Sequence, residues 1–337
     1  MQKAISLSSI ILRLSLWLAV AAVLFLTATA MFADFDRVIK LLSGISLQWL
    51  GLIILAVLFN YALRFAKWSW FLRLLNIRVP FKLNLWVFFS AFTMVLSPAK
   101  LGELVKSLLL KNRLGIPISA TAPIIMAERL TDLIGLLILC AAGFSQFAYG
   151  GRMLLLTGAL IASGAICLTR PSFWNLADRA LNLHPKLAGL KSAVRAMQQS
   201  TGSILNLKAM MVSVPLSAIS WAGEGVALFM IFRAMGLQTD NLPAISIFAH
   251  AFGSIAGALS FLPGGLLVTE GTMGMFFVFA AIPEAQAVSA TFLIRALTLW
   301  FAVCLGTLVF AFGHQRSDLQ AFTLSPESGS SCATGDQ

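Results

Sequence analysis

Two groups of ionisable residues interrupt the apolar stretches that make up most of this sequence. The first group is Glu103 with Pro98 and Gly102 before it, and the second is Glu128, Arg129 and Asp132. A charge inside an apolar segment is unfavourable unless it is paired or reached by water, so charges in such positions usually serve function. On a helix, Arg129 and Asp132 are three residues apart and share a face with Glu128. We therefore treat both groups as parts of one candidate binding site.

A second, altered copy of these groups occurs later in the chain. Its residues are Pro263, Gly264, Gly265, Glu270 and Arg295. Pro117 precedes Arg129 by twelve residues, and Pro283 precedes Arg295 by the same twelve. This order and spacing predict an internal repeat. The second copy has no acidic counterpart of Asp132, so the two copies are not expected to be functionally equivalent.

The two arginines are the residues best suited to binding a phosphate group. A guanidinium presents a rigid fork of donors to phosphate oxygens, and helix N-termini at the proline and glycine breaks add partial positive charge. We expect Arg129 and Arg295 to contact a lipid phosphate. Glu103 and Glu270 would position the arginines, bind a cationic or hydroxylated part of the headgroup, or carry a proton. The alternative is that these Glu–Arg pairs only hold the chain in place.

Composition identifies a membrane protein with several crossings. Of the 337 residues, 59% are hydrophobic and only 11% are charged, against roughly 25% charged in a soluble domain. The net charge of +11 is attributed to membrane topology rather than to nucleic-acid binding. The four cysteines and three histidines are scattered and have no ligand spacing, so neither a metal site nor a cofactor is expected.

The expected fold is all-α, with about six transmembrane helices and two re-entrant helical hairpins in one domain, residues 1–315. The predicted crossings are residues 10–32 (expected to stay uncleaved), 46–63, 122–144, 153–169, 209–232 and 288–312. Residues 83–97 are too short for a crossing of about 20 residues, so we predict a hairpin there and a second over 243–282. Residues 172–207 are interpreted as a cytoplasmic amphipathic helix or an ordinary helical loop, and 316–337 as a disordered polar tail.

This arrangement places both termini in the cytoplasm and the chain in a cell (inner) membrane. It puts 19 of the 24 lysines and arginines on the cytoplasmic side. Arg64 and Lys67 are interpreted as part of a basic cluster after the second span, and Lys106 as a side chain that reaches the membrane surface. Three crossings separate the repeats, about 46–144 and 209–312, so the copies are inverted. Inverted repeats with interrupted helices are typical of transporters.

Over about residues 10–315 the sequence resembles the flippase-like family named for the membrane region of lysylphosphatidylglycerol synthase. The matching residues are Arg64, Trp68, Leu72, Pro98, Gly102-Glu103, Glu128-Arg129, Asp132, Pro263-Gly264-Gly265 and Glu270-Gly271. One departure is Leu267-Val268-Thr269, where a glycine and often an arginine are expected. The resemblance implies movement of a lipid, or of a lipid-linked precursor, between leaflets. The aminoacyl-transferase domain of the best-known members is not expected in this chain.

Three functions are compatible with these residues. The leading hypothesis is a non-enzymatic flippase for an anionic or glycosylated lipid, whose partner is the phosphate-containing headgroup. The second is a membrane glycosyl- or acyl-transferase that uses Glu103 or Asp132 as base, although no catalytic constellation is found. The third is a non-catalytic membrane partner of a separate lipid-modifying enzyme, docking through residues 172–207. The sequence does not indicate an oligomeric state.

Overall fold

The computed structural model describes residues 35–97, 102–144 and 204–323, together with isolated positions between 152 and 201. Every regular element in these ranges is helical, which confirms the all-α fold class. In chain order they are α2 (Phe35–Ser43), α3 (Leu47–Leu74), α4 (Phe81–Ser90), η1 (Ala91–Met94), α5 (Val105–Leu114), α6 (Ile118–Phe144), α10 (Leu207–Ala234), α11 (Leu242–Leu259), η4 (Pro263–Gly265), α12 (Val268–Phe279), α13 (Glu284–Arg295), η5 (Ala296–Trp300) and α14 (Phe301–Thr323).

Four of the described helices are long and apolar enough to cross a membrane, which confirms a multi-pass membrane protein. They are Leu47–Leu74, Leu207–Ala234, Leu242–Leu259 and Glu284–Gly313. Helices α3 and α10 have 28 residues each, about 42 Å in length, against a hydrocarbon thickness of about 30 Å. Helix α6 has 27 residues, but it carries three charged side chains that need partners inside the protein.

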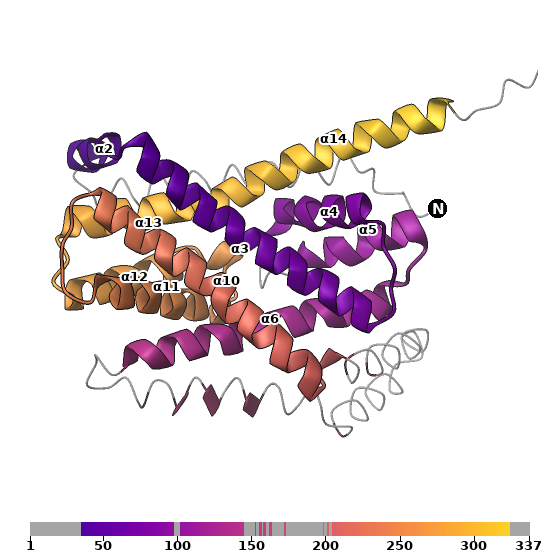
Figure 1. The fold of residues 1–337 in the computed structure, drawn as a ribbon, viewed down its shortest axis with the longest axis horizontal. Helices are drawn as coiled ribbons and strands as arrows, with labels where there is room; N and C mark the ends of the chain where they lie inside the picture. The colour runs from indigo at the N-terminus through magenta and orange to yellow at the C-terminus, as the bar shows by residue number, and fades with distance from the viewer. Residues whose placement is uncertain are drawn as a thin grey trace, which may run out of the picture.

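Helices α3 and α10 pack side by side at the centre of the molecule, and they run in opposite directions (Figure 1). Between the two helices, the side-chain amide nitrogen of Asn60 donates to the backbone oxygen and to the hydroxyl of Ser220, at 2.8 and 2.9 Å. These two residues are 160 positions apart. The first and last residues of α3 and α10 are separated by the same 160 positions, so the two helices meet at equivalent points.

The described halves of the chain repeat the same order of backbone features. Asn76 follows α3 and Gly236 follows α10, 160 positions apart and both in the left-handed region, with φ of 56° and 78°. Further along, Gly115 and Ala281 again adopt positive φ, 71° and 54°, 166 positions apart, just before α6 and α13. Each half thus contains a long helix, a pair of shorter helices and a second long helical segment.

The shorter helices form two hairpins at opposite ends of the molecule (Figure 1). In one, α4 and η1 lead to a turn, and α5 returns beside α4. In the other, α11 leads through η4 to α12, which packs against it. The 14 residues of α4–η1 and the 12 of α12 are only about 18–21 Å long, which is too short for a crossing. Helix α11, in contrast, has 18 residues and is one of the four candidate spans, so the re-entrant course of the second hairpin stays a prediction.

Two helix boundaries differ from the prediction. Helix α3 continues to Leu74 instead of ending near residue 63, because residues 64–74 contain no proline or glycine to stop it. Helix α14 continues to Thr323, past the expected start of the tail at 316, because Gln, Arg, Leu and Ala in this stretch favour helix. Residues 324–337 lie outside the described chain.

Several sequence predictions fall on residues that the structure does not describe. They concern the first span (10–32), Pro98, and most of the fourth span (153–169) and of the segment 172–207. These remain predictions.

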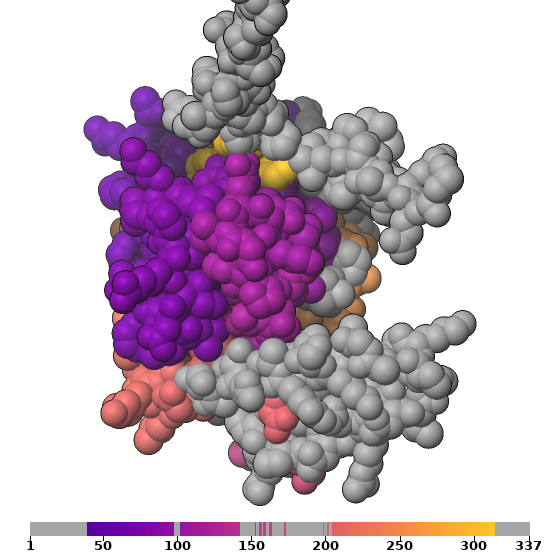
Figure 2. All heavy atoms as spheres, turned by 90° about the vertical axis from the view of Figure 1, so that its right-hand side faces the viewer, coloured from indigo at the N-terminus to yellow at the C-terminus, as the bar shows by residue number. Residues whose placement is uncertain are grey.

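The two ends of the molecule differ in charge. Figure 2 looks onto the end that contains the α4–α5 hairpin. Its exposed basic residues are Arg73, Arg78, Lys82, Lys111, Arg113 and Lys208. At the opposite end the exposed charged residues include Lys40, Arg233, Asp240 and Glu284. The basic end is the one expected to face the cytoplasm.

Candidate functional site

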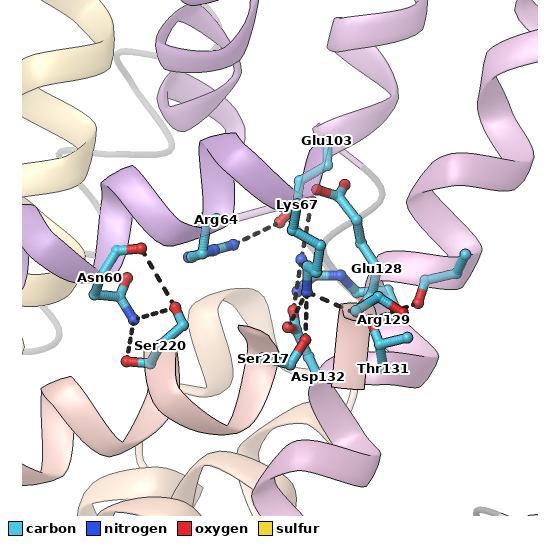
Figure 3. Close-up of polar contacts among 12 residues, drawn as sticks. Asn60, Arg64, Lys67, Glu103, Glu128, Arg129, Thr131, Asp132, Ser217 and Ser220 are labelled. Carbon is cyan, nitrogen blue, oxygen red and sulfur yellow. Dashed lines mark hydrogen bonds and ion pairs between the residues drawn. The ribbon is translucent and has the colours of Figure 1, made fainter. Parts of the chain in front are cut away.

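Seven charged side chains from α3, α6 and the first hairpin gather inside the fold, and Figure 3 labels all of them except Lys106. This charge cluster consists of Arg64, Lys67, Glu103, Lys106, Glu128, Arg129 and Asp132. Four are cations and three are carboxylates, so the cluster has one positive charge in excess. An excess cation in an apolar setting favours binding of an anion.

Glu103 is the centre of this cluster. Its carboxylate lies 3.0 Å from the guanidinium of Arg129, 3.5 Å from that of Arg64 and 3.5 Å from the ammonium of Lys106. The turn before it requires glycine at 102, because a Cβ there would lie 2.5 Å from the backbone oxygen of Met94. The Gly102 N–H donates to the Ser97 hydroxyl at 2.6 Å. The turn therefore fixes the position of Glu103.

The pair of Asp132 and Lys67 joins α6 to α3, and Lys67 in turn contacts α10. Asp132 forms ion pairs with Lys67 and, at 3.2 Å, with Arg129. The Lys67 ammonium also donates to the Ser217 hydroxyl of α10 at 2.7 Å and to Thr131 at 3.4 Å. Lys67 is only 2% exposed, so its charge depends on these partners. Lys67 is therefore a buried residue of α3, and its predicted place in a basic cluster after the second span is wrong.

Lys106 is also buried rather than directed to the membrane surface. Its ammonium pairs with Glu128 and lies 4.4 Å from the centroid of the Trp68 ring. The carboxylate and the ring together compensate the cost of burying this charge. The predicted surface role of Lys106 is therefore corrected to that of a partner of Glu128.

In the second half of the chain, Arg295 is held at the turn of the second hairpin. It pairs with Glu270 of α12, and its guanidinium donates to the backbone oxygen of Gly264 at 2.7 Å. Gly264 and Gly265 adopt φ of 60° and 67°, a region in which glycine is favoured. The turn that begins at Pro263 thus presents a carbonyl directly to the arginine.

A turn of π-helix follows Arg295. It covers Ala296–Trp300, whereas Arg129 lies inside the uninterrupted helix α6. The hydroxyl of Tyr61 on α3 donates to the backbone oxygen of Thr298 at 2.7 Å. Single turns of π-helix occur frequently at functional sites. Here the turn connects the second half of the chain to α3.

A central cavity of about 60 Å³ lies between the helix pair α3 and α10 and the second hairpin. The polar and aromatic residues that line it include Tyr61, Arg64, Trp221, Glu224, His250 and Arg295. A volume of this size holds a few water molecules. Arg129 does not line the cavity. Of the predicted site residues, Gly264, Gly265 and Arg295 do.

Arg64 connects the central cavity with the charge cluster. Its guanidinium pairs with Glu103 on one side and lines the cavity on the other. It lies 5.8 Å from the centroid of the Phe92 ring and 6.0 Å from that of Trp221. Charged groups from both halves of the chain thus form one continuous polar region inside an otherwise apolar protein.

Comparison with known proteins identifies the family. The family described as "Lysylphosphatidylglycerol synthase TM region" matches residues 11–306. The chain belongs to this family. The match confirms the resemblance on which the sequence-based expectations partly rest.

The protein has relatives in archaea. A UPF0104 membrane protein of Methanothermobacter thermautotrophicus is 28% identical over 235 residues, which cover 63% of this chain and 68% of the relative. One of Pyrococcus horikoshii is 24% identical over 311 residues, 82% of this chain and 90% of the relative. One of Methanocaldococcus jannaschii is 23% identical over 227 residues, 64% and 91% of the two chains. No solved structure matches the chain.

Several polar residues of the charge cluster and the central cavity are not among the site residues predicted from the sequence. Lys67 was readable as part of a longer α3, since no helix-breaking residue separates it from the apolar run. Glu224, at mid-length of the fifth predicted span, stands out in the sequence as a charge without a repeat partner; Arg64, 160 positions earlier at the repeat distance of α3 and α10, is its counterpart. His250 and Tyr61 gave no signal, because an isolated polar residue in an apolar helix has no recognisable spacing.

The described residues contain no group of three or more His, Cys, Asp or Glu side chains that could hold a metal ion. A larger hollow of about 550 Å³ lies at the basic end of the protein, where α3 ends and α4 begins. Arg73 and Arg78 line it together with apolar side chains. None of the predicted site residues lies there, so the central cavity is the stronger candidate site.

Proposed function

We propose that this protein moves an anionic or glycosylated lipid, or a lipid-linked precursor, between the leaflets of the cell membrane. The observation that carries the proposal is that Arg64 and Arg295, one from each half of the chain, line the same cavity. Two guanidinium groups offer bidentate hydrogen bonds to the oxygens of one phosphate. Membership of a family named for a lipid-related membrane region supports a role with lipids.

The ion pairs provide a way for the lipid phosphate to enter and leave. Arg64 is paired with Glu103 and Arg295 with Glu270. A phosphate that enters the cavity replaces one carboxylate at each arginine, and the carboxylates return when it leaves. Exchange of one anionic partner for another keeps each arginine compensated throughout. This lowers the barrier that a charged headgroup meets in the bilayer.

The hairpins determine which side the lipid can enter from. Their turns meet the central region from opposite ends of the molecule (Figure 1), and each turn carries one of the carboxylates that hold an arginine. A small movement of either hairpin would open the cavity toward one leaflet. Alternating movement of two related units around a fixed central site is the usual scheme of transporters with inverted repeats.

The experiment is a lipid-scrambling assay with the purified chain in liposomes. Phosphatidylglycerol with a fluorescent label is placed in both leaflets, and a membrane-impermeant reductant quenches the outer leaflet only. Wild-type protein should expose the inner-leaflet lipid to the reductant, and Arg295→Gln should lose this activity. Arg233→Gln, which removes an exposed arginine outside the cavity, is the matched control and should keep it.

The same assay separates transport from catalysis and from a passive partner role. Mass spectrometry of the lipid before and after the reaction should find an unchanged headgroup. Failure of the isolated protein to move phosphatidylglycerol and any glycolipid tested would contradict the proposal. Activity that required a separate lipid-modifying enzyme would favour the partner role instead.

A further inference from the structure

The central cavity contains a carboxylate–imidazole pair that the proposed transport mechanism does not use. Glu224 lies at mid-length in α10 and His250 at mid-length in α11. The Oε2 atom of Glu224 is 3.3 Å from the Nε2 atom of His250. The two residues are 5% and 4% exposed, and both line the cavity. Histidine is the side chain whose ordinary titration falls between pH 5 and 8.

The charged and titratable groups around this pair come from every element packed against it. Helix α3 contributes Arg64 and Tyr61, and α13 contributes Arg295. Glu270 of α12 is paired with Arg295. The charged residues of α6, which also packs against α11, are Glu128, Arg129 and Asp132, and all three are held by ion pairs in the charge cluster.

The ionisable residues that line the cavity give it a definite charge balance. Among the lining residues alone, with neutral His250, the cations Arg64 and Arg295 and the anion Glu224 leave one positive charge; the carboxylates of Glu103 and Glu270, which pair with the arginines, do not line the cavity. Protonation of the imidazole raises the positive charge of the lining residues to two. In a buried site such a change strongly alters the affinity for an anion, since Coulomb interactions are weakly screened there.

We propose that Glu224 and His250 form a proton-binding site that makes anion binding in the cavity dependent on proton uptake. This inference rests on the proposed function, because it assumes that a phosphate group enters the cavity. A proton from water is added to the imidazole ring, which becomes an imidazolium held by the Glu224 carboxylate. No covalent bond of the protein or the lipid breaks. The proton and one negative charge of a phosphodiester then enter together, so the combined step is electrically neutral.

The test measures proton uptake when a phosphate compound binds. Purified full-length protein in a neutral detergent is titrated with dihexanoyl phosphatidylglycerol by calorimetry, in buffers of different ionisation enthalpy, from pH 6 to 8. The buffer dependence of the heat gives the number of protons taken up. Wild type should take up protons, and its affinity should weaken as pH rises, by about tenfold per pH unit at most, the limit for one linked proton.

Three variants make the result specific to this pair. His250→Gln keeps a hydrogen-bonding group near Glu224 and should lose proton uptake, with an affinity that no longer changes with pH. Glu224→Gln removes a negative charge from the cavity and should bind more tightly than wild type at pH 8. The double substitution His184→Gln and His314→Gln, at the other two histidines of the chain, should behave as wild type.

Glycerophosphoglycerol, the same phosphodiester headgroup without acyl chains, serves as a second probe and distinguishes a lipid from a free phosphate compound. Proton-linked binding of the lipid alone assigns the site to lipid, and proton-linked binding of both assigns it to the phosphate group itself. Binding of either probe by wild type without proton uptake, or unchanged uptake in His250→Gln, overturns the inference and leaves the proposed function standing. Absence of binding by wild type with both probes contradicts both.

Discussion

At the scale of single residues, the unusual feature is that buried charges compensate one another in a shared network rather than in isolated pairs. Glu103 contacts three cations and Asp132 contacts two. A buried ion pair is weak evidence for stability, but removing one partner leaves an uncompensated charge. Removing any one charged side chain of the network is therefore destabilising. Because several partners are within reach, one ion pair can also be exchanged for another.

The Lys67–Asp132 pair gives a direct test of this compensation. Lys67→Met should lower the free energy of unfolding by about 3–5 kcal/mol, because Asp132 loses a buried partner. The double variant Lys67→Met with Asp132→Leu should lose less than the sum of the single variants, since it removes both charges. Unfolding in mixed micelles, followed by circular dichroism, measures these differences.

An exposed lysine provides the control for this comparison. Lys208→Met at the basic end should change the free energy of unfolding by no more than about 0.5 kcal/mol. Additive losses in the double variant would mean that Lys67 and Asp132 are not coupled.

At the scale of helices, the hairpins depend on glycines at the points of closest approach. A Cβ on Gly102 would lie 2.4 Å from the Cβ of Met94. In the second hairpin, a Cβ on Gly257 would lie 2.1 Å from the Thr269 hydroxyl and 3.3 Å from the Cα of Gly265. The 2.4 Å and 2.1 Å distances are too short for real contacts, so a larger residue at either glycine requires neighbouring atoms to shift.

Gly102→Ala should therefore displace Glu103 and reduce lipid movement, and it should lower the thermal midpoint of unfolding by several degrees. Gly274→Ala is the matched control, because a Cβ on this α12 residue meets nothing within 4 Å. It should stabilise the helix by about 0.5–1 kcal/mol, since alanine has the higher helix propensity. A fully active and stable Gly102→Ala variant would show that this turn does not position the site.

Much of the arrangement of helices and hairpins could be predicted from the sequence. The proline and glycine breaks indicated both hairpins, and the spacing of Arg129 and Arg295 from their prolines indicated related segments. The predicted end of α3 near residue 63 is too early, because Arg64 and Lys67 end the apolar run without a proline or glycine that would end the helix. Pairings such as Lys67 with Asp132 depend on where α3, α6 and α10 meet. No local pattern in the sequence encodes that contact.

At the scale of the whole molecule, the two hairpins lie at opposite ends, around a central antiparallel pair of α3 and α10 (Figure 1). One end carries six exposed basic residues of the described chain, and the other carries exposed charges of both signs. We propose that the basic end faces the cytoplasm, as the distribution of lysine and arginine in membrane proteins indicates.

Cysteine labelling tests this orientation. In a cysteine-free background, Arg113→Cys at the basic end should react with a membrane-impermeant maleimide only in inside-out vesicles. Arg233→Cys at the other end should react only in right-side-out vesicles. Labelling of both positions from the same side would contradict the proposed orientation and the opposition of the two hairpins.

The central claim is that Arg64 and Arg295 together hold the phosphate of a membrane lipid. Native mass spectrometry of the detergent-solubilised protein measures this most directly, because it reports which lipids remain bound. Wild type and Arg233→Gln should retain a phosphate-bearing lipid, whereas Arg64→Gln and Arg295→Gln should lose about tenfold or more in occupancy, as expected for a charge-assisted hydrogen bond worth about 1.5–3 kcal/mol. Equal retention of the same lipid by all four proteins would show that the cavity arginines do not bind it.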